Sequence, residues 1–433
     1  MKPASNSVSA VEVSQPGYAA YIGIDWADQK HDLCLYDPVT EQLEFSVIGS
    51  QPESIAAWAE GLRKRFNGRA IAICTEQKRG PLIYALCKYD FFVIYPINPH
   101  TVAKYRQAFA PSRAKADPTD ARILVELLLK HPDKLQAWQP SSAQLRSLQQ
   151  LVENRRMLVA EKVRLTNRIT AALKSYYPQV LEWFEDKDTQ VFCDFLTHYP
   201  SLKSAQTALS EELELFFKTH HVVQSKTINR RLEQIQQGVV LTEDAGIVEP
   251  LQLLVAALVA QLQVLLPSIA TFDAKIEALF ATHPDAALFA ALPGAGPQLA
   301  PRLLVAFGEE RSRFQTAQDL LRYAGIAPVK ESSGQKSWIH WRWSCPKFLR
   351  QTFVEWALQT RKHSFWAEAF YQMQRQKGKT HQAAIRALAF KWIRIVFRCW
   401  QDKQPYDEVK YLMALKRKGS PLVQNLALVE EIK

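Results

Sequence analysis

Four carboxylates are the first residues in this sequence whose positions point to chemistry. Asp25 and Glu76 each stand directly after a short apolar run with the length of a buried strand. A carboxylate at the tip of a central strand is held by a rigid backbone, which suits a metal ligand. Asp117 and Asp120 open a helix, and residues three apart share one helix face, so both could reach one metal pair. Together the four acids offer the oxygen ligands that Mg²⁺ or Mn²⁺ needs in a two-metal site.

The acids at the start of that helix also have an ordinary structural explanation. Asp117 would act as the N-cap, Pro118 would occupy the first helical position and Asp120 the third. Capping and metal binding are compatible, and both interpretations stay open for these two residues. The presence of Asp25 and Glu76 favours metal binding.

A pair of serines provides a candidate nucleophile in the second half of the chain. Ser332 and Ser333 precede Gly334, and a Ser-Ser-Gly sequence is typical of a loop. Serines are common in loops, but basic residues surround this pair: Lys330, Lys336, Arg342, Lys347 and Arg350. A serine hydroxyl is a weak nucleophile at neutral pH and requires activation by a base or a metal. His340, seven residues after Ser333, is not at an obvious partner position.

Aromatic residues are interleaved with this basic cluster. Trp338, Trp341 and Trp343 offer flat faces for stacking on bases or sugars, and the alternation over 338–343 is typical of a strand. The alternative is that these tryptophans belong to the core. Two helices are expected around Gly378, and the second carries four basic side chains that could project toward phosphates: Arg386, Lys391, Arg394 and Arg398.

The charge of the chain is unevenly distributed. The whole chain of 433 residues carries a net charge of +11. Residues 322–418 contain 20 Lys or Arg and 6 Asp or Glu, giving +14, so the remainder sums to −3. A basic C-terminal third on a near-neutral body indicates a polyanionic partner such as a nucleic acid. The alternative is a solvated basic surface without a partner.

The carboxylates need a scaffold, and the N-terminal region predicts one. Residues 1–18 are expected to form a flexible tail. From 19 to 135 the pattern predicts a mixed sheet with helices on its faces, in the order strand 20–25, strand 32–36, strand 43–48, helix 52–65, strand 70–75, helix 81–88 and strand 91–97. That order is the one of a ribonuclease-H-like fold, which builds metal sites at strand ends.

The rest of the chain is expected to be mainly helical. In residues 141–175 leucines recur every seven positions, which predicts a long amphipathic helix, and a second limb is expected from 250 to about 281. The pattern favours a helical hairpin or coiled coil over 136–285 that spaces domains or dimerises; an ordinary packed helix is the alternative. An insertion near 180–250 shows no evident chemistry. A mainly helical domain, 286–403, and a loosely attached tail, 404–433, complete the chain.

Cysteine usage and hydropathy indicate a cytoplasmic protein. The six cysteines are scattered without a Cys-x-x-Cys pair, which disfavours a zinc site or a disulfide framework. The N-terminus lacks the apolar segment of a signal peptide. The longest uncharged stretch, 250–272, contains glutamines and prolines, and it suits a buried helix better than a membrane span.

In combination, these motifs resemble the DEDD-type transposases of bacterial insertion sequences, the one-ten family. In the first half the resemblance rests on segments 21–25 (Tyr-Ile-Gly-Ile-Asp), 73–76 (Ile-Cys-Thr-Glu), 97–99 (Ile-Asn-Pro) and 115–122, with its two aspartates and an arginine. In the second half it rests on segments 292–296 (Leu-Pro-Gly-Ala-Gly), 323–328 (Tyr-Ala-Gly-Ile-Ala-Pro) and 333–334 (Ser-Gly). Together these segments are specific to this family.

The resemblance implies an architecture and a set of partners. A RuvC-like catalytic domain would occupy 19–135, a coiled-coil segment 136–285 and a transposase domain 286–403. The family's proteins are serine-dependent recombinases guided by a bridge RNA. Expected partners are therefore DNA at the element ends and target, a bridge RNA, and further copies of the chain in a dimer or tetramer with composite active sites. The expected location is the bacterial cytoplasm, with nucleoid association when DNA is bound.

The resemblance also implies roles for individual residues. Asp25, Glu76, Asp117 and Asp120 would hold divalent metal. Ser333, which directly precedes the glycine, would be the nucleophile, and Ser332 is the alternative.

Two other functions compete with a strand-transfer enzyme. A metal-dependent nuclease or junction resolvase would use water as the nucleophile, and it would form no covalent protein–DNA adduct. A non-catalytic nucleic-acid-binding protein would show no metal-dependent cleavage, and four coordinated carboxylates would be an unexplained source of charge repulsion in it.

Overall fold

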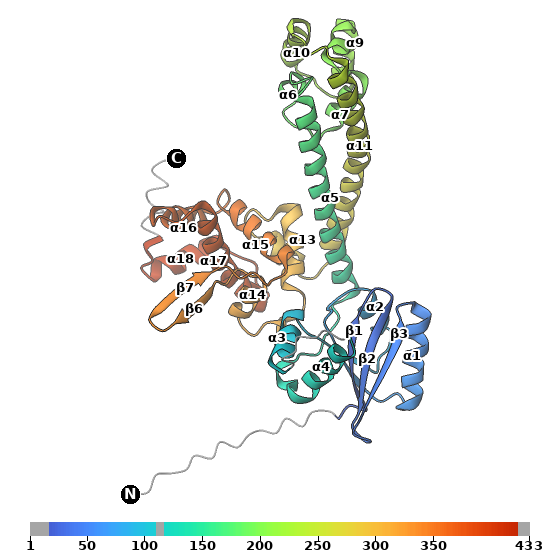
Figure 1. Cartoon of the computed structure of the whole chain (residues 1–433). Coiled ribbons are helices and arrows are strands. Elements are labelled where there is room, and N and C mark those ends of the chain that lie inside the picture. The colour runs from blue at the N-terminus through green and yellow to red at the C-terminus, as the bar shows by residue number, and fades with distance from the viewer. Residues whose placement is uncertain (1–16, 110–116, 423–433) are drawn as a thin grey trace. The chain divides into compact units, whose positions relative to one another are not determined.

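The computed structural model of the chain describes residues 17–109 and 117–422, and the side chains of 109, 117 and 118 lie outside the description. The chain divides into two compact units, with the boundary after Pro140 (Figure 1). The first unit holds the large sheet, and the second consists mainly of helices.

A five-stranded mixed sheet forms the centre of the first unit. Its order is β3-β2-β1-β4-β5, with β1 in the middle. The first three of these strands pair antiparallel, whereas β1, β4 and β5 pair in parallel. The bounds are β1 Ala20–Trp26, β2 Lys30–Asp37, β3 Gln42–Gly49, β4 Ile71–Thr75 and β5 Phe92–Pro96. The predicted mixed sheet is therefore confirmed.

Helices cover both faces of this sheet, as the alternation in β1 requires. Ile22 and Ile24 lie in one core with residues of α1 (Pro52–Arg65) and α2 (Pro81–Leu86). Gly23, between them, faces the opposite side, where α4 (Asp117–Lys130) packs after α3 (Pro99–Phe109). A short 3₁₀ turn, η1 (Pro132–Lys134), follows α4. Figure 1 shows α1 and α4 on opposite sides of the strands.

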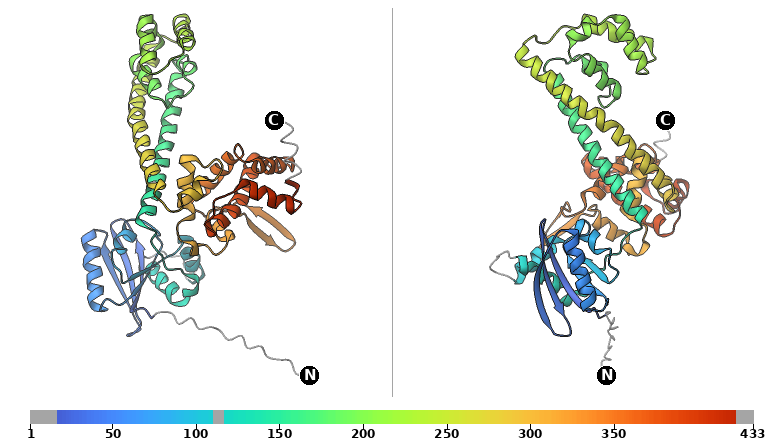
Figure 2. Two further views of the ribbon diagram at one scale, coloured as in Figure 1. Left: turned by 180° about the vertical axis from the view of Figure 1, so that it is seen from behind. Right: turned by 90° about the vertical axis from the view of Figure 1, so that its right-hand side faces the viewer.

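Two long helices form the first part of the second unit. They are α5 (Ala143–Leu173) and α11 (Ala245–Ala281), which run side by side in the views of Figures 1 and 2. An ion pair joins them, with Arg155 Nη2 3.1 Å from Asp273 Oδ2. The two helical limbs predicted from the heptad-like pattern and the apolar stretch are present.

The segment between these helices forms an aromatic core of its own. Five helices occupy it: α6 Val180–Trp183, α7 Gln190–His198, α8 Leu202–Thr207, α9 Ser210–Thr219 and α10 Ser225–Gln237. Trp183, Phe195 and Phe217 are fully buried there, together with residues from the adjoining ends of α5 and α11. The insertion near 180–250 is therefore a packed cap on the two long helices.

Helix α11 is the one helix in the described part of the chain that is long and apolar enough to cross a membrane. Its most apolar window has a mean hydropathy of 2.1, and 28% of that window is buried. Val255, Leu258 and Leu262 pack in the aromatic core, whereas Leu253 and Val264 face outward. A core helix of a soluble protein passes the same length and composition test.

A second core holds the C-terminal helices together. Its helices are α12 Ala286–Ala290, α13 Gly296–Phe307, α14 Ala317–Tyr323, α15 Lys347–Thr360, α16 Phe365–Gln376 and α17 His381–Gln401, with a 3₁₀ turn, η2, at Arg311–Arg313. Trp356, Trp366, Trp392 and Trp400 are fully buried in it. The two helices predicted around Gly378 are α16 and α17.

The expectation of a loose tail from residue 404 is wrong for its described part. Helix α18 (Glu408–Arg417) follows Tyr406, and both Tyr406 and Tyr411 pack against the C-terminal core. Trp366 Nε1 donates to the Tyr406 hydroxyl at 2.7 Å. The buried aromatic and hydrogen-bonding partners that hold this segment come from α16 and α17, which the segment's own sequence does not reveal. Residues 423–433 lie outside the described residues.

Candidate functional site

Asp25 and Glu76 stand at neighbouring strand ends in the first unit. In the parallel pairing of β1 with β4, Ile24 is opposite Thr75, so the two acids are the next residues along adjacent strands. Side chains alternate along a strand, so Asp25 shares the face of Gly23, the face that α4 covers. Both acids are half-buried. The register of β1 with β4 therefore places both acids at strand ends, where the sequence predicts them.

Asp120 is brought close to β1 because α4 packs against Gly23. A Cβ added to Gly23 would overlap the Ala121 carbonyl oxygen and lie 2.9 Å from Leu124 Cβ, so α4 packs directly on the backbone of β1. Asp120, the neighbour of Ala121, is 3% exposed. Its Oδ1 lies 2.6 Å from Arg106 Nε of α3. Asp117 begins α4, but its side chain lies outside the description.

The donor set fits a hard divalent cation in its chemistry, because carboxylate oxygens are the ligands Mg²⁺ prefers. Among the side chains that the structure describes, no three His, Cys, Asp or Glu residues form a metal-sized group. Asp25 and Glu76 are neighbours by register, whereas Asp120 is held by Arg106. Asp117 is not among the side chains searched, so its part in such a group stays a prediction.

Sequence reasoning missed one acid beside this edge. Asp32 lies directly opposite Asp25 in the antiparallel β1–β2 pairing, and it is 7% exposed. Residues paired across a ladder share a face, so Asp32 and Asp25 point to the same side of the sheet. The sequence predicts the second strand over 32–36, whereas β2 begins at Lys30. The pairing register of the β1–β2 hairpin places Asp32 beside Asp25 at this edge of the sheet.

Gly23→Ala is expected to destabilise the first unit, because the new methyl group would overlap the Ala121 carbonyl oxygen. Overpacking of this kind costs about 1–3 kcal/mol, and here a backbone atom must move. Gly61→Ala in α1 is the matched control, since nothing lies within 4 Å of its added Cβ. Thermal denaturation should show a lower Tm for Gly23→Ala and an unchanged or slightly higher Tm for Gly61→Ala. Equal Tm values would contradict the close packing of α4 on β1.

The two serines lie in a β-hairpin of the second unit, which corrects the expectation of a flexible loop. The hairpin consists of β6 (Val329–Ser333) and β7 (Lys336–His340), joined by a two-residue turn in which Gly334 has φ +56°. Glycine adopts this left-handed conformation without steric cost. Ladder pairing continues to the pair Ser333 and Lys336, so the serines have fixed neighbours.

The pairing separates the two serines. Adjacent strand residues point to opposite faces, so Ser333 shares a face with its partner Lys336, and Ser332 with Ser337. Both serines are exposed. His340 lies on the Ser333 face but four pairs away, roughly 14 Å at 3.4 Å per residue. Its Nε2 is 2.7 Å from Glu331 Oε1. The Trp341 carbonyl and this carboxylate raise the pKa of His340, which therefore sits in an ion pair rather than beside a serine.

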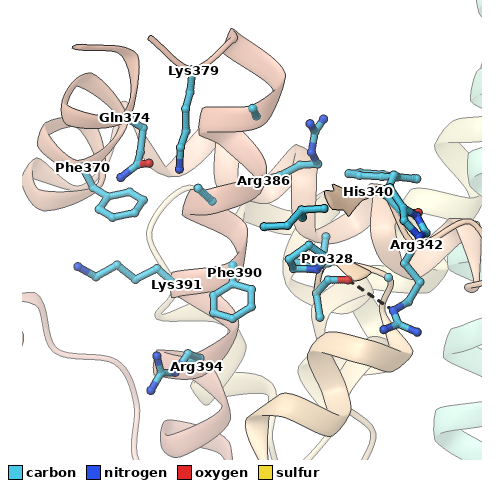
Figure 3. A pocket seen from close by; sticks show the side chains of 17 residues that line it. Pro328, His340, Arg342, Phe370, Gln374, Lys379, Arg386, Phe390, Lys391 and Arg394 are labelled. Carbon is cyan, nitrogen blue, oxygen red and sulfur yellow. Dashed lines mark hydrogen bonds between the residues drawn. The ribbon is translucent and has the colours of Figure 1, made fainter. Parts of the chain in front are cut away.

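A basic and aromatic pocket lies at the base of this hairpin, between β7, α16 and α17 (Figure 3). Its volume is about 760 Å³, within the range of small-molecule sites. Four of the basic residues predicted to bind nucleic acid line it: Arg342, Arg386, Lys391 and Arg394. Arg342 Nε donates to the Ala327 carbonyl at 3.4 Å, the dashed line in Figure 3.

The predicted tryptophans divide between this pocket and the open surface. Trp341 lies between two guanidinium groups, with Arg350 4.6 Å and Arg386 4.5 Å from the ring centroid. Trp338 and Trp343 are 47% and 80% exposed, so neither is a core residue. Stacking of these two rings on bases or sugars stays a prediction.

The remaining predicted basic residues lie outside the pocket. Lys330, Lys336 and Lys347 are exposed on the hairpin and at the start of α15. Arg350 Nη1 donates to the Arg342 carbonyl at 2.9 Å, which ties α15 to the segment after the hairpin. Arg398 is 86% exposed, with its Nε 3.6 Å from Asp402 Oδ2. The pocket residues that were not predicted include Phe370, Gln374, Lys379 and Phe390.

Lys391→Met is expected to stabilise the second unit at neutral pH. Burial lowers the pKa of Lys391 to about 8, although the rings of Phe370 and Trp366 lie 4.8 and 5.2 Å from Nζ. An unfolded lysine titrates near 10.4, so between about 8 and 10.4 the unfolded chain binds a proton that the folded one lacks. Stability of the native protein therefore rises with pH across this window, and the cost of the buried charge is fully present below it.

The measurement is the Tm of Lys391→Met and of the native protein at pH 7 and pH 9.5. The gain from methionine should be larger at pH 7 and shrink at pH 9.5. Lys377→Met, at an exposed position in the same region, is the control and should show no such pH dependence. A gain that is equal at both pH values would contradict the buried charge.

Comparison with protein families gives two matches along the chain. A transposase model of the DEDD type from IS110 elements matches residues 22–178. A second model, described as the IS116/IS110/IS902 transposase family, matches residues 286–372. Together they cover more than half of the chain and include both the carboxylate edge and the serine hairpin.

Individual relatives agree with these matches. The mini-circle putative transposase for IS117 of Streptomyces coelicolor is 27% identical over 417 residues, covering 94% of this chain and 98% of the relative. An uncharacterized IS110 protein of the same organism is 27% identical over 69% of this chain and 73% of its own length. The pilin gene-inverting protein of Moraxella bovis is 33% identical over 33% of this chain and 46% of its own length. Because both family domains and a relative of matching length agree, the chain belongs to the IS110 family of transposases.

Proposed function

We propose that this transposase cuts and exchanges DNA strands through attack of a serine hydroxyl on a DNA phosphate, assisted by divalent metal and guided by a bridge RNA. The observation that carries the metal part is the pairing of Ile24 with Thr75, because it sets two carboxylates at adjacent strand ends. The serine part is supported by the exposed Ser333 beside Lys336 at the hairpin turn. Guidance by RNA is supported by the family resemblance and by the basic C-terminal region.

The proposed roles follow from the chemistry of the groups. Asp25, Glu76, Asp117 and Asp120 would hold Mg²⁺ or Mn²⁺, which when bound supplies a positive charge that polarises the scissile phosphate. Ser333 Oγ forms a bond to phosphorus while the bond from phosphorus to the leaving strand oxygen breaks. The serine proton ends on that leaving oxygen. Lys336 and the nearby basic side chains offset the charge of the phosphate.

The two halves of this chemistry lie in different units of the chain. The carboxylates belong to the unit before residue 141 and the serines to the unit after it. We therefore propose a composite active site, assembled across units or across copies in a dimer or tetramer. The Moraxella relative is described as inverting a gene, and inversion and transposition would both use this strand exchange. Cytoplasmic location and nucleoid association are part of the same proposal.

The test is incubation of the protein with labelled DNA that spans the gene and its flanks, with Mg²⁺ or with EDTA. Denaturing electrophoresis should show cleaved DNA and a protein–DNA adduct in Mg²⁺ alone. Peptide mapping of the adduct should place the link in 329–340. Cleavage without an adduct would mean that water is the nucleophile and that the protein is a metal nuclease. Absence of cleavage on all DNA would leave only a binding function.

DNA binding is expected to fall steeply with salt if the basic region contacts phosphates. Each phosphate neutralised on duplex DNA contributes a log–log slope of roughly −0.9. Arg394→Glu removes a pocket cation and should weaken binding to all sequences alike, with a shallower slope. Arg398→Glu, at an 86% exposed position beside Asp402, is the comparison and should have a smaller effect. Binding that does not change with salt would contradict the assignment of this region.

A further inference from the structure

We propose that the pocket at the base of the hairpin holds one unpaired nucleotide of the DNA strand that is being exchanged. The proposal rests on the proposed function for the identity of the strand. It assigns a ligand to the cavity that β7, α16 and α17 enclose. It also gives roles to residues that the cleavage chemistry does not use.

The lining of the pocket selects an anion with a flat ring. Its 17 residues include five Lys or Arg and no Asp or Glu. The rings of Phe370 and Phe390 face the same space (Figure 3), and Trp341 is a further aromatic residue of the lining. Base stacking on aromatic rings is a main contribution to the binding of unpaired nucleotides, and cationic side chains bind their phosphates. A nucleotide combines both features, whereas a fully paired duplex keeps its base faces covered.

The buried side-chain amide of Gln374 is positioned to form hydrogen bonds with the edge of a base. Gln374 is 6% exposed, and its Oε1 has no hydrogen-bond partner among the residues that the structure describes. Figure 3 shows the amide of Gln374 between Phe370 and Lys379, on the pocket side of α16. A glutamine amide offers both a donor and an acceptor, the pattern that pairs with a base edge. Buried polar groups are nearly always hydrogen-bonded, so an unpaired acceptor in a pocket wall indicates a missing partner.

The cations are spread so that a strand can enter and leave. In Figure 3, Lys379 and Arg394 lie at opposite ends of the ring of lining side chains, with Arg386 between them. Phosphates on both sides of a bound nucleotide would therefore each meet a positive charge. Arg386 is additionally fixed by its contact with Trp341, 4.5 Å from the ring centroid.

The hairpin relates the pocket to the serines. His340 lines the pocket and lies four positions along β7 from Lys336, the partner of Ser333. At 3.4 Å per strand residue this distance is about 14 Å. Nucleotides in a stacked strand are 3.4 Å apart and those in an unstacked strand are farther apart, so the pocket lies at most about four nucleotides from the phosphate at Ser333. Strand exchange must unpair bases close to the cut, which makes DNA the source of the nucleotide.

The experiment compares two labelled DNA duplexes of the same sequence, one fully paired and one with a single unpaired nucleotide. Fluorescence anisotropy would give Kd values for the native protein, Gln374→Met and Gln376→Met. Methionine preserves the volume of glutamine, and Gln376 is an exposed residue of the same helix. The native protein and Gln376→Met should prefer the duplex with the unpaired nucleotide about tenfold, and Gln374→Met should lose most of that preference.

Thermal denaturation separates this role from a role in folding. Removing an unpaired buried acceptor should leave the Tm of Gln374→Met unchanged or raised, so a loss of preference with a retained Tm supports the pocket. An unchanged preference in Gln374→Met, or equal native affinity for both duplexes, overturns the proposal while leaving the transposase function intact. A Gln374 effect that is confined to single-stranded RNA of the same sequence overturns the DNA source. Failure to bind either duplex overturns the proposed function as well.

Discussion

Asp25→Asn is expected to reduce Mg²⁺-dependent DNA cleavage by about a thousandfold or more while the protein stays folded. The side chain keeps its shape but loses the charge that a metal ligand at this strand end provides. Metal polarisation of a phosphate contributes several kcal/mol to transition-state stabilisation, and each 1.36 kcal/mol changes the rate about tenfold. Cleavage rates in saturating Mg²⁺ and the Tm of the variant would be measured together.

Asp28→Asn is the matched control, because Asp28 is an exposed acid in the turn that follows β1. It should cleave DNA at the native rate. Full activity of Asp25→Asn, or an equal loss in Asp28→Asn, would end the assignment of a metal site to this edge. Parallel variants of Glu76, Asp117 and Asp120 should also lose cleavage, although Asp117→Ala additionally removes an expected helix cap worth about 0.5–2 kcal/mol.

Ser333→Ala is expected to abolish the covalent adduct and the recombinant product while leaving DNA binding unchanged. No other side-chain oxygen would replace the attacking hydroxyl, because the neighbouring serine points to the opposite face of the hairpin. The readout is denaturing electrophoresis of labelled DNA after incubation with Mg²⁺. Ser333→Cys is expected to keep partial activity, since a thiol is intrinsically nucleophilic.

Ser332→Ala is the internal control for this experiment, since the two serines are adjacent and equally exposed. It should retain the adduct. If the two alanine variants show the reverse pattern, Ser332 is the nucleophile. If both variants cleave normally and neither native nor variant protein forms an adduct, the enzyme is a nuclease that uses water.

The sheet could be predicted from the sequence because its rules are local. Apolar runs between turn residues define β1, β4 and β5, and the parallel pairing of β1 with β4 places Asp25 beside Glu76 once the strand order is known. The close packing of α4 on Gly23 was not predictable in the same way. It depends on a steric contact between residues about 100 positions apart in the chain, 23 and 121, and this contact is what carries Asp120 to β1.

The second unit shows where local patterns fail. The turn between Ser333 and Lys336 contains Gly-Gln rather than the common Asn-Gly or Asp-Gly, so the sequence pattern predicts a loop where the structure has a hairpin. Gln374 gave no signal, because its importance arises only when α16 and α17 enclose a cavity with the segment that follows α14. The same holds for Tyr406, which is fixed by a tryptophan 40 residues away in sequence.

Helix α5 belongs to two hydrophobic cores at once, and this has a thermodynamic consequence. Its first turns, at Leu145, Leu148 and Val152, enter the C-terminal core, whereas Leu165, Ile169 and Leu173 enter the aromatic cap. Separate cores give separate cooperative units, which open with their own free energies. The cap can therefore melt from its end of α5 without exposing the tryptophans around α17. A calorimetric trace of this chain should then show more than one unfolding transition. No single unfolding free energy therefore describes the molecule.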